Sequence, residues 1–352
     1  MIEIGSEKRF FDFISGLNDK DKVALISHID LDGISAAKVI DEVVDADSVK
    51  FLQYDEIDMN LVEQLKIDGY RKVIFTDLYM ENEDVVREIG KFAEILILDH
   101  HPSDKDWNSE RIVYIKSEEG YCATYLCYRL FRKIKDIENL DWLVAGACVA
   151  DFCNLKNKEW MEEIFDKYNQ EKGDYRDKLG FDYDDIDKSK IYRLQWELSL
   201  AIIYFRNNLK KVFDEIGESF GDIGDLSDYS EKIQKEIDEA LKKFEKEKKE
   251  ISDGFIFTFS PNMRIGGIVS TIISSRNSNK KIILFMEKEK GYSLSARRQD
   301  KKVDMGEFVK NLLAGLEEAK GGGHIPAAGG YFLKKDFDEV MRRLGVGAEK
   351  SS

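Results

Sequence analysis

Four short apolar segments in the first 150 residues constrain the fold of this chain more than any other feature. Each has the length and the near-continuous apolar character of a buried strand, and helix-like stretches separate them. Strands that alternate with helices favour a parallel sheet covered on both faces, so the sequence predicts an α/β fold here. The strands are expected at 22–28, 48–54, 71–77 and 94–100, and the helices at 35–46, 58–68 and 81–93.

The remaining sequence divides into a helical part and a second α/β part. A helical block is expected at 121–150, and the charge-dense residues 155–250 are mostly helix-forming, with a loop-like middle at 217–230. The segment 230–251 is expected to be one long helix, either a solvated linker or a helix that binds a partner or nucleic acid. Strands return at 255–260, 281–287, 291–297 and 329–335, with helices at 266–276, 305–319 and 336–344.

These patterns predict two α/β domains, and we expect them to face each other across a cleft. The N-terminal parallel-sheet domain is expected at 1–154, a charged helical insertion or linker at 155–253, and a smaller α/β domain at 254–345.

Charge is distributed unevenly along the chain. The net charge of −15 argues against a protein that coats long nucleic acid by charge alone. Residues 255–345, however, contain 16 Lys and Arg against 10 Asp and Glu, a net charge of +6, which leaves −21 for the rest. A carboxylate-rich body with a basic C-terminal module suits an enzyme that holds metal ions in one part and a phosphate chain in the other.

The sequence has no apolar run of the roughly 20 residues that a membrane span needs. Its N-terminus also lacks the basic-then-apolar layout of a secretory signal. We therefore expect a cytoplasmic protein with no membrane partner. No protein partner is indicated, and a homodimer is compatible with the sequence.

The cysteines allow two interpretations. Cys122 and Cys127 fall in an apolar, helix-like run, where positions five apart lie on different faces. A zinc site would pair them with Cys148 and Cys153, but the four-residue gaps are wider than those of the usual zinc knuckle. Reduced, buried thiols are therefore expected rather than a zinc site or disulfides.

The chain's four histidines stand in unusual company. Three follow or end expected strands beside aspartates, and His324 follows three glycines. In an extended segment, side chains at alternate positions point the same way, so the spacing His28, Asp30, Asp32 predicts three converging ligands. Imidazole and carboxylates without thiolates suit manganese, with magnesium or iron(II) as alternatives. Further candidates at strand or helix ends are Asp77, Asp99, His100, His101 and Asp151.

Adjacent histidines cannot both face one way from a regular strand. We therefore expect one of His100 and His101 to bind metal and the other to point toward substrate, with Asp99 orienting a histidine.

Taken together, these motifs resemble those of the DHH phosphoesterase family. SHIDLDGISAA, the strand end at Asp77, DHH at 99–101 and GACVAD occur in the family's order. GYSLSARR and GGGHIPAAGG are similar to the DHH-associated C-terminal domain of the RecJ-like and nanoRNase branches. The resemblance covers about 20–153 and 255–335; Lys320 stands where relatives often have a fourth glycine.

The resemblance implies two manganese ions, with Mg²⁺ or another divalent ion as alternatives. His28, Asp30 and Asp77 would bind one ion. The other would be bound by Asp32, Asp77, His100 and Asp151, so that Asp77 bridges. His101 would contact the scissile phosphate or protonate the leaving oxygen.

In the C-terminal part, successive N–H groups of Gly321, Gly322 and Gly323 can form an anion nest, with His324 and Arg297 as charged donors. A tight glycine loop without a ligand is the alternative.

The resulting expectation is a metal-dependent exonuclease that hydrolyses short single-stranded oligonucleotides to nucleoside 5′-monophosphates. The alternatives are a phosphodiesterase of cyclic di-AMP or a linear dinucleotide, a 3′-phosphoadenosine 5′-phosphate phosphatase, or an inactive RecJ-like replication scaffold. The presence of every expected ligand favours the enzymes over the scaffold.

Overall fold

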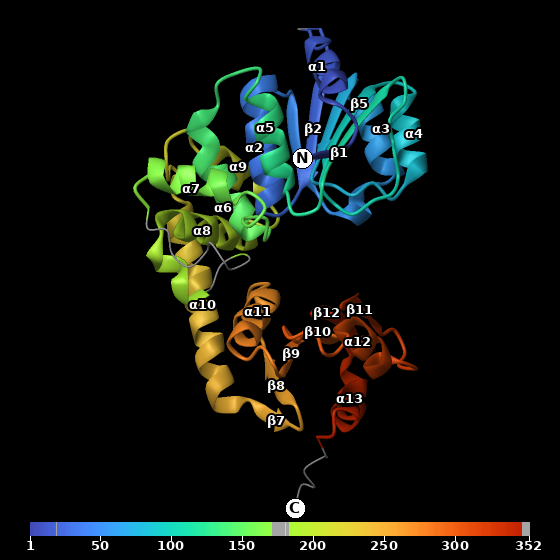
Figure 1. Ribbon diagram of the computed structural model, residues 1–352. Helices are drawn as coiled ribbons and strands as arrows, with labels where there is room; N and C mark the ends of the chain where they lie inside the picture. Colours follow the sequence, from blue (N-terminus) through green and yellow to red (C-terminus); the bar gives the residue numbers. More distant parts are fainter. Residues whose placement is uncertain (19, 171–179, 181–182, 347–352) are drawn as a thin grey trace, which may run out of the picture. The chain divides into compact units, whose positions relative to one another are not determined.

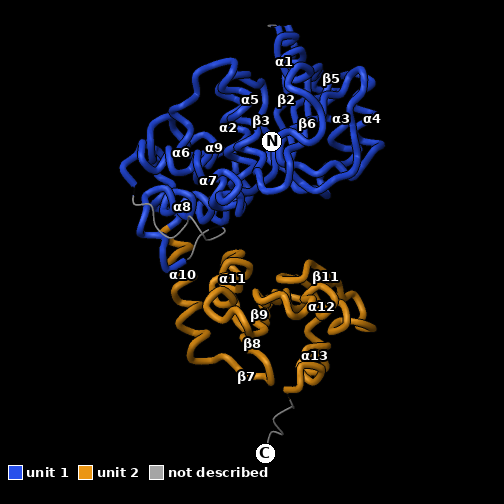
Figure 2. Tube along the Cα trace, in the orientation of Figure 1, with its two compact units in different colours: residues 1–230 blue, residues 231–352 orange. Residues whose placement is uncertain are grey.

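The computed structural model describes residues 1–18, 20–170, 180 and 183–346. The chain forms two compact units, residues 1–230 and 231–352 (Figure 2), with the boundary inside helix α10 (Leu226–Glu247). The three-part division expected from the sequence remains a prediction, although residues 155–230 belong to the first unit.

A six-stranded sheet in the order β1-β6-β5-β4-β2-β3 is the centre of the first unit (Figure 1). All neighbouring strands are parallel except β1, which runs antiparallel to β6 at one edge. The α/β fold and the parallel sheet expected from the sequence are thus confirmed. The strands are β1 (Ile2–Ile4), β2 (Val23–His28), β3 (Ser48–Leu52), β4 (Lys72–Thr76), β5 (Glu94–Asp99) and β6 (Ile112–Ser117).

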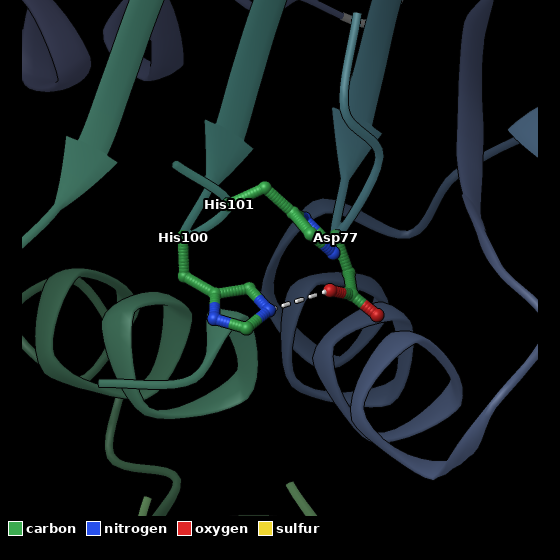
Figure 3. Close-up of side chains that lie close together, drawn as sticks. All are labelled: Asp77, His100 and His101. Carbon is green, nitrogen blue, oxygen red and sulfur yellow. Dashed lines mark ion pairs between the residues drawn. The ribbon is translucent and has the colours of Figure 1, made fainter. Parts of the chain in front are cut away.

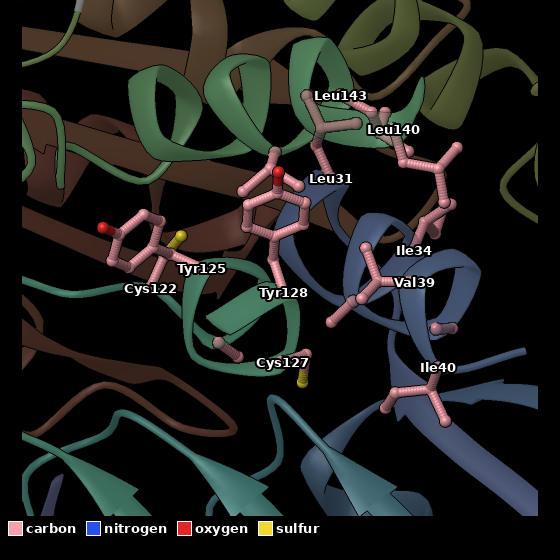
Figure 4. Close-up of a cluster of buried hydrophobic side chains, with 14 of the residues drawn as sticks. Leu31, Ile34, Val39, Ile40, Cys122, Tyr125, Cys127, Tyr128, Leu140 and Leu143 are labelled. Carbon is pink, nitrogen blue, oxygen red and sulfur yellow. The ribbon is translucent and has the colours of Figure 1, made fainter. Parts of the chain in front are cut away.

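Alternate residues of the strands enter two different cores. Val23 and Leu25 pack with helices α2 and α5, whereas Ala24 and Ile26 pack with α3 and α4 on the other face. Figure 4 shows the first of these cores between α2, α5 and α6. The helices are α1 (Glu7–Ser15), α2 (Leu31–Val44), α3 (Met59–Ile67), α4 (Glu83–Gly90), α5 (Ala123–Phe131), α6 (Asp141–Ala150), α7 (Lys158–Lys167), α8 (Lys190–Tyr204) and α9 (Leu209–Glu215), with short 3₁₀ turns η1 (Tyr54–Glu56), η2 (Glu138–Leu140) and η4 (Tyr183–Lys188).

The second unit is built on a mixed sheet in the order β11-β12-β10-β9-β8-β7. Only β8 and β9 are parallel. Helix α12 covers one face, where Val309 and Leu313 pack against Phe285 and Phe332. The elements are β7 (Lys249–Ile251), β8 (Gly254–Phe259), α11 (Gly266–Arg276), β9 (Lys281–Glu287), β10 (Gly291–Arg297), α12 (Met305–Leu313), β11 (Lys320–His324), β12 (Ala327–Leu333), η5 (Lys334–Asp336) and α13 (Phe337–Arg343).

Two sequence-based expectations are wrong. The extended run from His28 to Asp32 ends at Asp30, because Asp30 caps helix α2 by accepting a hydrogen bond from Gly33 N–H. The long helix expected at 230–251 begins earlier, at Leu226, and stops at Glu247, because Lys249–Ile251 pairs with β8. Gly321, Gly322 and Gly323 lie in strand β11, and anion binding by their N–H groups stays a prediction.

The cysteines are buried and free. Cys122 and Cys148 have their sulfur atoms 3.7 Å apart, whereas Cys127 lies 3.5 Å from the Thr76 hydroxyl. Within the described ranges, no helix combines the length and the apolar character that crossing a membrane requires.

Candidate metal centre

Three adjacent parallel strands deliver the predicted ligands to one edge of the first sheet. β5, β4 and β2 are neighbours, and their carboxyl ends lead into His100, Asp77 and His28. Ligand sites of open α/β sheets lie at this edge. The predicted residues are therefore brought together by the strand order and not by their separation in sequence.

Asp77 lies between two histidines and presents a different oxygen to each. Its Oδ2 is 3.6 Å from His28 Nδ1, and its Oδ1 is 3.2 Å from His100 Nε2. Figure 3 shows the second pair, with the His101 ring next to it. One ligand atom each from His28, Asp30 and Asp77 lie within 4.8 Å of one another. Each oxygen of this carboxylate thus faces a different imidazole.

The backbone at Asp77 is itself unusual. Its φ of 56° is in the left-handed region, directly after β4, while its N–H still donates to Leu98 O at 3.0 Å. Asp tolerates this region better than most residues, but such conformations are uncommon and cluster at functional sites. The conformation directs the side chain away from the strand and toward the two histidines.

Asp32 reaches the centre from helix α2 rather than from an extended segment. It is buried, and its two carboxylate oxygens accept hydrogen bonds from Ala123 N–H and Thr124 N–H at 2.8 and 2.9 Å. These N–H groups form the first turn of α5, so a helix N-terminus stabilises the negative charge. Asp32 Oδ2 lies 3.7 Å from His100 Nε2.

Asp151 joins the centre from the end of helix α6. Its Oδ2 lies 3.7 Å from His100 Nδ1, the ring nitrogen opposite the one that faces Asp77. The Cys153 thiol donates a hydrogen bond to Asp151 Oδ2 at 3.3 Å. The sequence did not indicate this contact between Cys153 and a proposed ligand. His100, Asp151 and Cys153 form another group whose ligand atoms lie within 4.8 Å of one another.

His101 is held from both of its ring nitrogens. Nδ1 lies 2.8 Å from Asp99 Oδ1, as the orienting role of Asp99 requires, and Nε2 lies 3.0 Å from the Tyr54 hydroxyl. Asp99 Oδ1 also accepts the backbone N–H groups of His100 and His101. One possible ligand atom from each of His101, Asp77 and His100 also lies within 4.8 Å of the others.

Tyr54 is the residue at this centre that sequence reasoning missed. Besides contacting His101, its ring stacks on His28 with centroids 4.8 Å apart and 23° between the planes. It lies in the turn after β3, next to β2 in the sheet. A lone tyrosine after a strand carries no distinctive pattern, and only the pairing of β2 with β3 places it at the site.

Burial and the crowding of carboxylates set the protonation of the ion-free centre. Burial disfavours the charged form of His28, but Asp30 and Asp77 outweigh this and raise the pKa of His28 to about 9. Burial first, and then the charges of Asp30 and Asp32, raises the pKa of Asp77 well above its usual range. Burial together with Asp32 raises the pKa of Asp151 to about 7.

A cation would resolve this crowding. His28 Nδ1 and Asp77 Oδ2 are buried and make no hydrogen bond of good geometry with any described residue, although Asp30 Oδ2 is 2.9 Å from the nitrogen. Buried polar atoms normally have partners. Imidazole and carboxylate donors suit manganese or magnesium, so the residues present fit divalent ions.

In the second unit, Arg297 on β10 and His324 on β11 lie at the same level of the sheet, on either side of β12. Both pair with Ala327 of the strand between them, so all three side chains share a face of the sheet. Arg297 Nε donates to Ser270 Oγ at 2.8 Å, and burial lowers the pKa of this guanidinium. Ser270 Oγ also lies 2.8 Å from Ser295 Oγ.

The glycines of β11 have a packing role that the sequence did not indicate. A side chain at Gly321 would place its Cβ 2.6 Å from Val309 of helix α12, and one at Gly330 2.9 Å from Leu313. Gly321 pairs with Gly330, so glycine at both positions lets α12 approach the sheet. Gly322 and Gly323 continue the strand, and a phosphate-binding role for them remains a prediction.

Comparison with known proteins bears on both units. Residues 255–344 match the DHHA1 domain. No curated protein matches the sequence. Among solved structures, exonuclease RecJ bound to manganese is similar in fold, with a TM-score of 0.68 at 14% identity over 97% of this chain and 94% of that one. Residues 255–344 are thus identified as a DHHA1 domain, and the chain as a whole has a RecJ-like fold.

Two other structures have the same fold at low identity. A pGpG-specific phosphodiesterase, PggH from Vibrio cholerae, matches with a TM-score of 0.54 and 14% identity over 92% of this chain and 97% of that one. CDC45 from Entamoeba histolytica matches with a TM-score of 0.61 and 10% identity over 96% of this chain and 98% of that one. At these identities the matches establish the fold alone.

Proposed function

We propose that this DHH/RecJ-like chain is a two-metal, manganese-type phosphodiesterase that hydrolyses short single-stranded oligonucleotides, RNA or DNA, to nucleoside 5′-monophosphates. The observation that carries the proposal is Asp77, whose two oxygens face His28 and His100 on opposite sides. Each histidine has a further carboxylate beside it, Asp30 or Asp151. The names of the manganese-bound RecJ and of PggH support the same class of reaction.

The residues divide into two proposed ion sites that share Asp77. His28 and Asp30 would complete the first, and Asp32, His100 and Asp151 the second. Paired divalent ions supply activation of a water and neutralisation of charge on the phosphate. The N–H groups of α5 bond both oxygens of Asp32, so this ligand of the second proposed site would be held in place before an ion binds.

His101 is the proposed group that contacts the scissile phosphate or protonates the leaving oxygen. Asp99 holds its Nδ1, which leaves Nε2 as the reactive nitrogen. The Tyr54 hydroxyl bonds this nitrogen in the structure, so a substrate oxygen has to share or replace that contact. Tyr54 would keep the ring oriented until substrate arrives.

Two enzymatic alternatives use the same centre. Cleavage of cyclic di-AMP or a linear dinucleotide is favoured by the likeness to PggH, and removal of the 3′-phosphate from 3′-phosphoadenosine 5′-phosphate needs the same phosphate chemistry. The fold shared with CDC45 suits an inactive scaffold, but the full set of ligand-type residues around Asp77 favours an enzyme.

The proposal is tested by ion content and by products. The purified protein should bind about two divalent ions per chain, lose activity in excess chelator and regain it best with Mn²⁺. With 5′- and 3′-labelled RNA and DNA of two to twenty nucleotides, mononucleotides released from one end are expected. Full activity in chelator would contradict the metal mechanism. Exclusive cleavage of a cyclic dinucleotide would favour the first alternative.

Ion binding should release protons and strengthen as pH rises. The ion-free pKa values of about 9 for His28 and about 7 for Asp151 mean that protons must leave before these groups bind metal. The apparent affinity for Mn²⁺ should rise from pH 6 to pH 8 by about tenfold per pH unit for each proton released. Calorimetry in two buffers of different ionisation enthalpy measures the proton count. Equal affinity at both pH values, with no proton release, would contradict these protonation states.

A further inference from the structure

Helix α6 ends in a motif that normally uses glycine, and this chain has phenylalanine there. Cys153 N–H donates to Cys148 O at 2.8 Å, and Phe152 N–H donates to Val149 O at 3.3 Å. This pair of hydrogen bonds is the Schellman motif, whose left-handed position is usually glycine. Phe152 occupies that position with a φ of 57°. A bulky side chain is strained in this conformation, so the helix end alone does not explain it.

Among the described residues, the Phe152 side chain gains little from packing that would offset this strain. It is 48% exposed and lies outside the buried core that contains Cys148, Val149 and Cys153. Gly180 does lie against it, because a Cβ there would be 2.3 Å from Phe152 Cδ1. The Phe152 ring therefore packs against backbone on one side.

A buried polar contact holds Gly180 in that position. Its N–H donates at 2.7 Å to Oδ1 of Asn154, a side chain that is buried. Gly180 itself has a φ of 76°, a conformation in which a side chain would be strained. This hydrogen bond thus positions one neighbour of an aromatic ring that is itself exposed.

Phe152 follows a proposed metal ligand in the chain. It comes directly after Asp151, whose carboxylate lies 3.7 Å from His100. The centre itself is rich in carboxylates, so an apolar ring is a contact that does not depend on charge. Leu155, 37% exposed, is the other exposed large apolar residue in this turn among the described residues. One ring and one leucine form a surface too small for a protein interface.

We propose that Phe152 is a stacking platform for a nucleobase of the substrate. The inference rests on the proposed function and names a base-binding contact for the same site. Every base has an aromatic face, and stacking on a protein ring recognises single-stranded nucleic acid without selecting its sequence. Such a contact next to the metal ligands would bind a nucleotide flanking the cleaved phosphodiester and would favour unpaired over paired bases.

The test compares a 5′-phosphorylated dinucleotide with the same compound carrying abasic sugars. Phe152→Gly should raise KM for the intact dinucleotide about tenfold, within the range of one base–aromatic stack, with a much smaller change in kcat. The wild-type preference for the intact over the abasic compound should fall toward one in this variant. Phe152→Trp should retain the preference, whereas Phe152→Leu, which keeps an apolar side chain but no ring, should lose it.

Controls separate stacking from folding and from the reaction itself. Phe152→Gly should not lower the melting temperature, because glycine is the favoured residue at this position. Ile67→Ala changes an 83% exposed apolar residue at the end of α3, near where β4 begins, and should leave KM unchanged. An unchanged KM and preference in Phe152→Gly and Phe152→Leu, with an active wild type, would overturn the inference alone. A wild type that cleaves no oligonucleotide would overturn the proposed function as well.

Discussion

Replacing Asp77 with alanine should lower kcat on an oligonucleotide by at least about 10³, the largest loss among the proposed ligands. Asp77 is the only one of them that presents separate oxygens to both histidines among the described residues. Its removal therefore disturbs both proposed ion sites, and residues that act as a unit show losses of this order. Ion content, measured on the same preparation, should fall below two per chain.

The loss should come from the site and not from unfolding. Burial and the neighbouring carboxylates raise the pKa of Asp77, so its charged form is unfavourable in the ion-free protein. Thermal stability without added metal should therefore be kept or raised in Asp77→Ala. Asp68→Ala, which changes an exposed aspartate at the end of α3, serves as the matched control. If Asp77→Ala retains a tenth of the wild-type rate, the carboxylate does not bridge.

The second large effect should appear in substrate binding. Arg297→Ala is expected to raise KM for an oligonucleotide by about 10- to 150-fold, because a charge-assisted hydrogen bond to phosphate contributes roughly 1.5–3 kcal/mol. Arg297 lies in the basic C-terminal segment and shares a sheet face with His324. The difference from wild type should shrink at high salt, where the wild-type contact is itself screened.

The choice of substrate decides what Arg297 does. A small phosphodiester such as bis-p-nitrophenyl phosphate has no second phosphate, so Arg297→Ala should cleave it nearly as well as wild type does. Equal losses on this compound and on an oligonucleotide would place Arg297 in the chemical step. Arg342→Ala, which removes an exposed arginine on α13, controls for lost charge in the same unit. No loss on either compound would leave Arg297 with a purely structural role.

The Arg297→Ala variant should still fold, because the partner of Arg297 has other hydrogen bonds. Ser270, which accepts from Arg297 Nε, also donates to Gly267 O and contacts Ser295. Its hydroxyl therefore keeps partners when the guanidinium is removed, and no buried polar group is left alone. A change in melting temperature should be small.

Local patterns in the sequence determined the main strands of the first sheet and where they end. Stretches such as 73–75 and 95–98 are apolar at every position because parallel strands are buried on both faces. A polar residue that ends such a run, as Asp77 does, must lie at the carboxyl edge of the sheet. The sequence therefore predicted most of the residues that meet at the candidate centre.

Two edge strands, β1 and β11, could not be found in the same way. β1 has three residues, and antiparallel pairing with β6 is what makes it a strand. β11 is built from glycines, whose intrinsic preference is for turns, so its local sequence favoured an anion-binding loop. Long-range pairing with β12 and the close approach of α12 override that preference. Tertiary contacts, not local propensity, decide such strands.

The arrangement within the centre was likewise decided by tertiary structure. The sequence placed Asp32 in an extended run. In the structure Asp32 lies in helix α2, and N–H groups at the N-terminus of α5 bond its carboxylate. Tyr54 reaches His28 and His101 only because β3 pairs with β2. The role proposed for Phe152 depends on its left-handed conformation at the end of α6, which the sequence did not indicate. The sequence by itself determined which groups are available for chemistry, because side-chain type and strand periodicity are local. Which atoms face one another depends on pairings between distant segments, and these exist only in the folded chain.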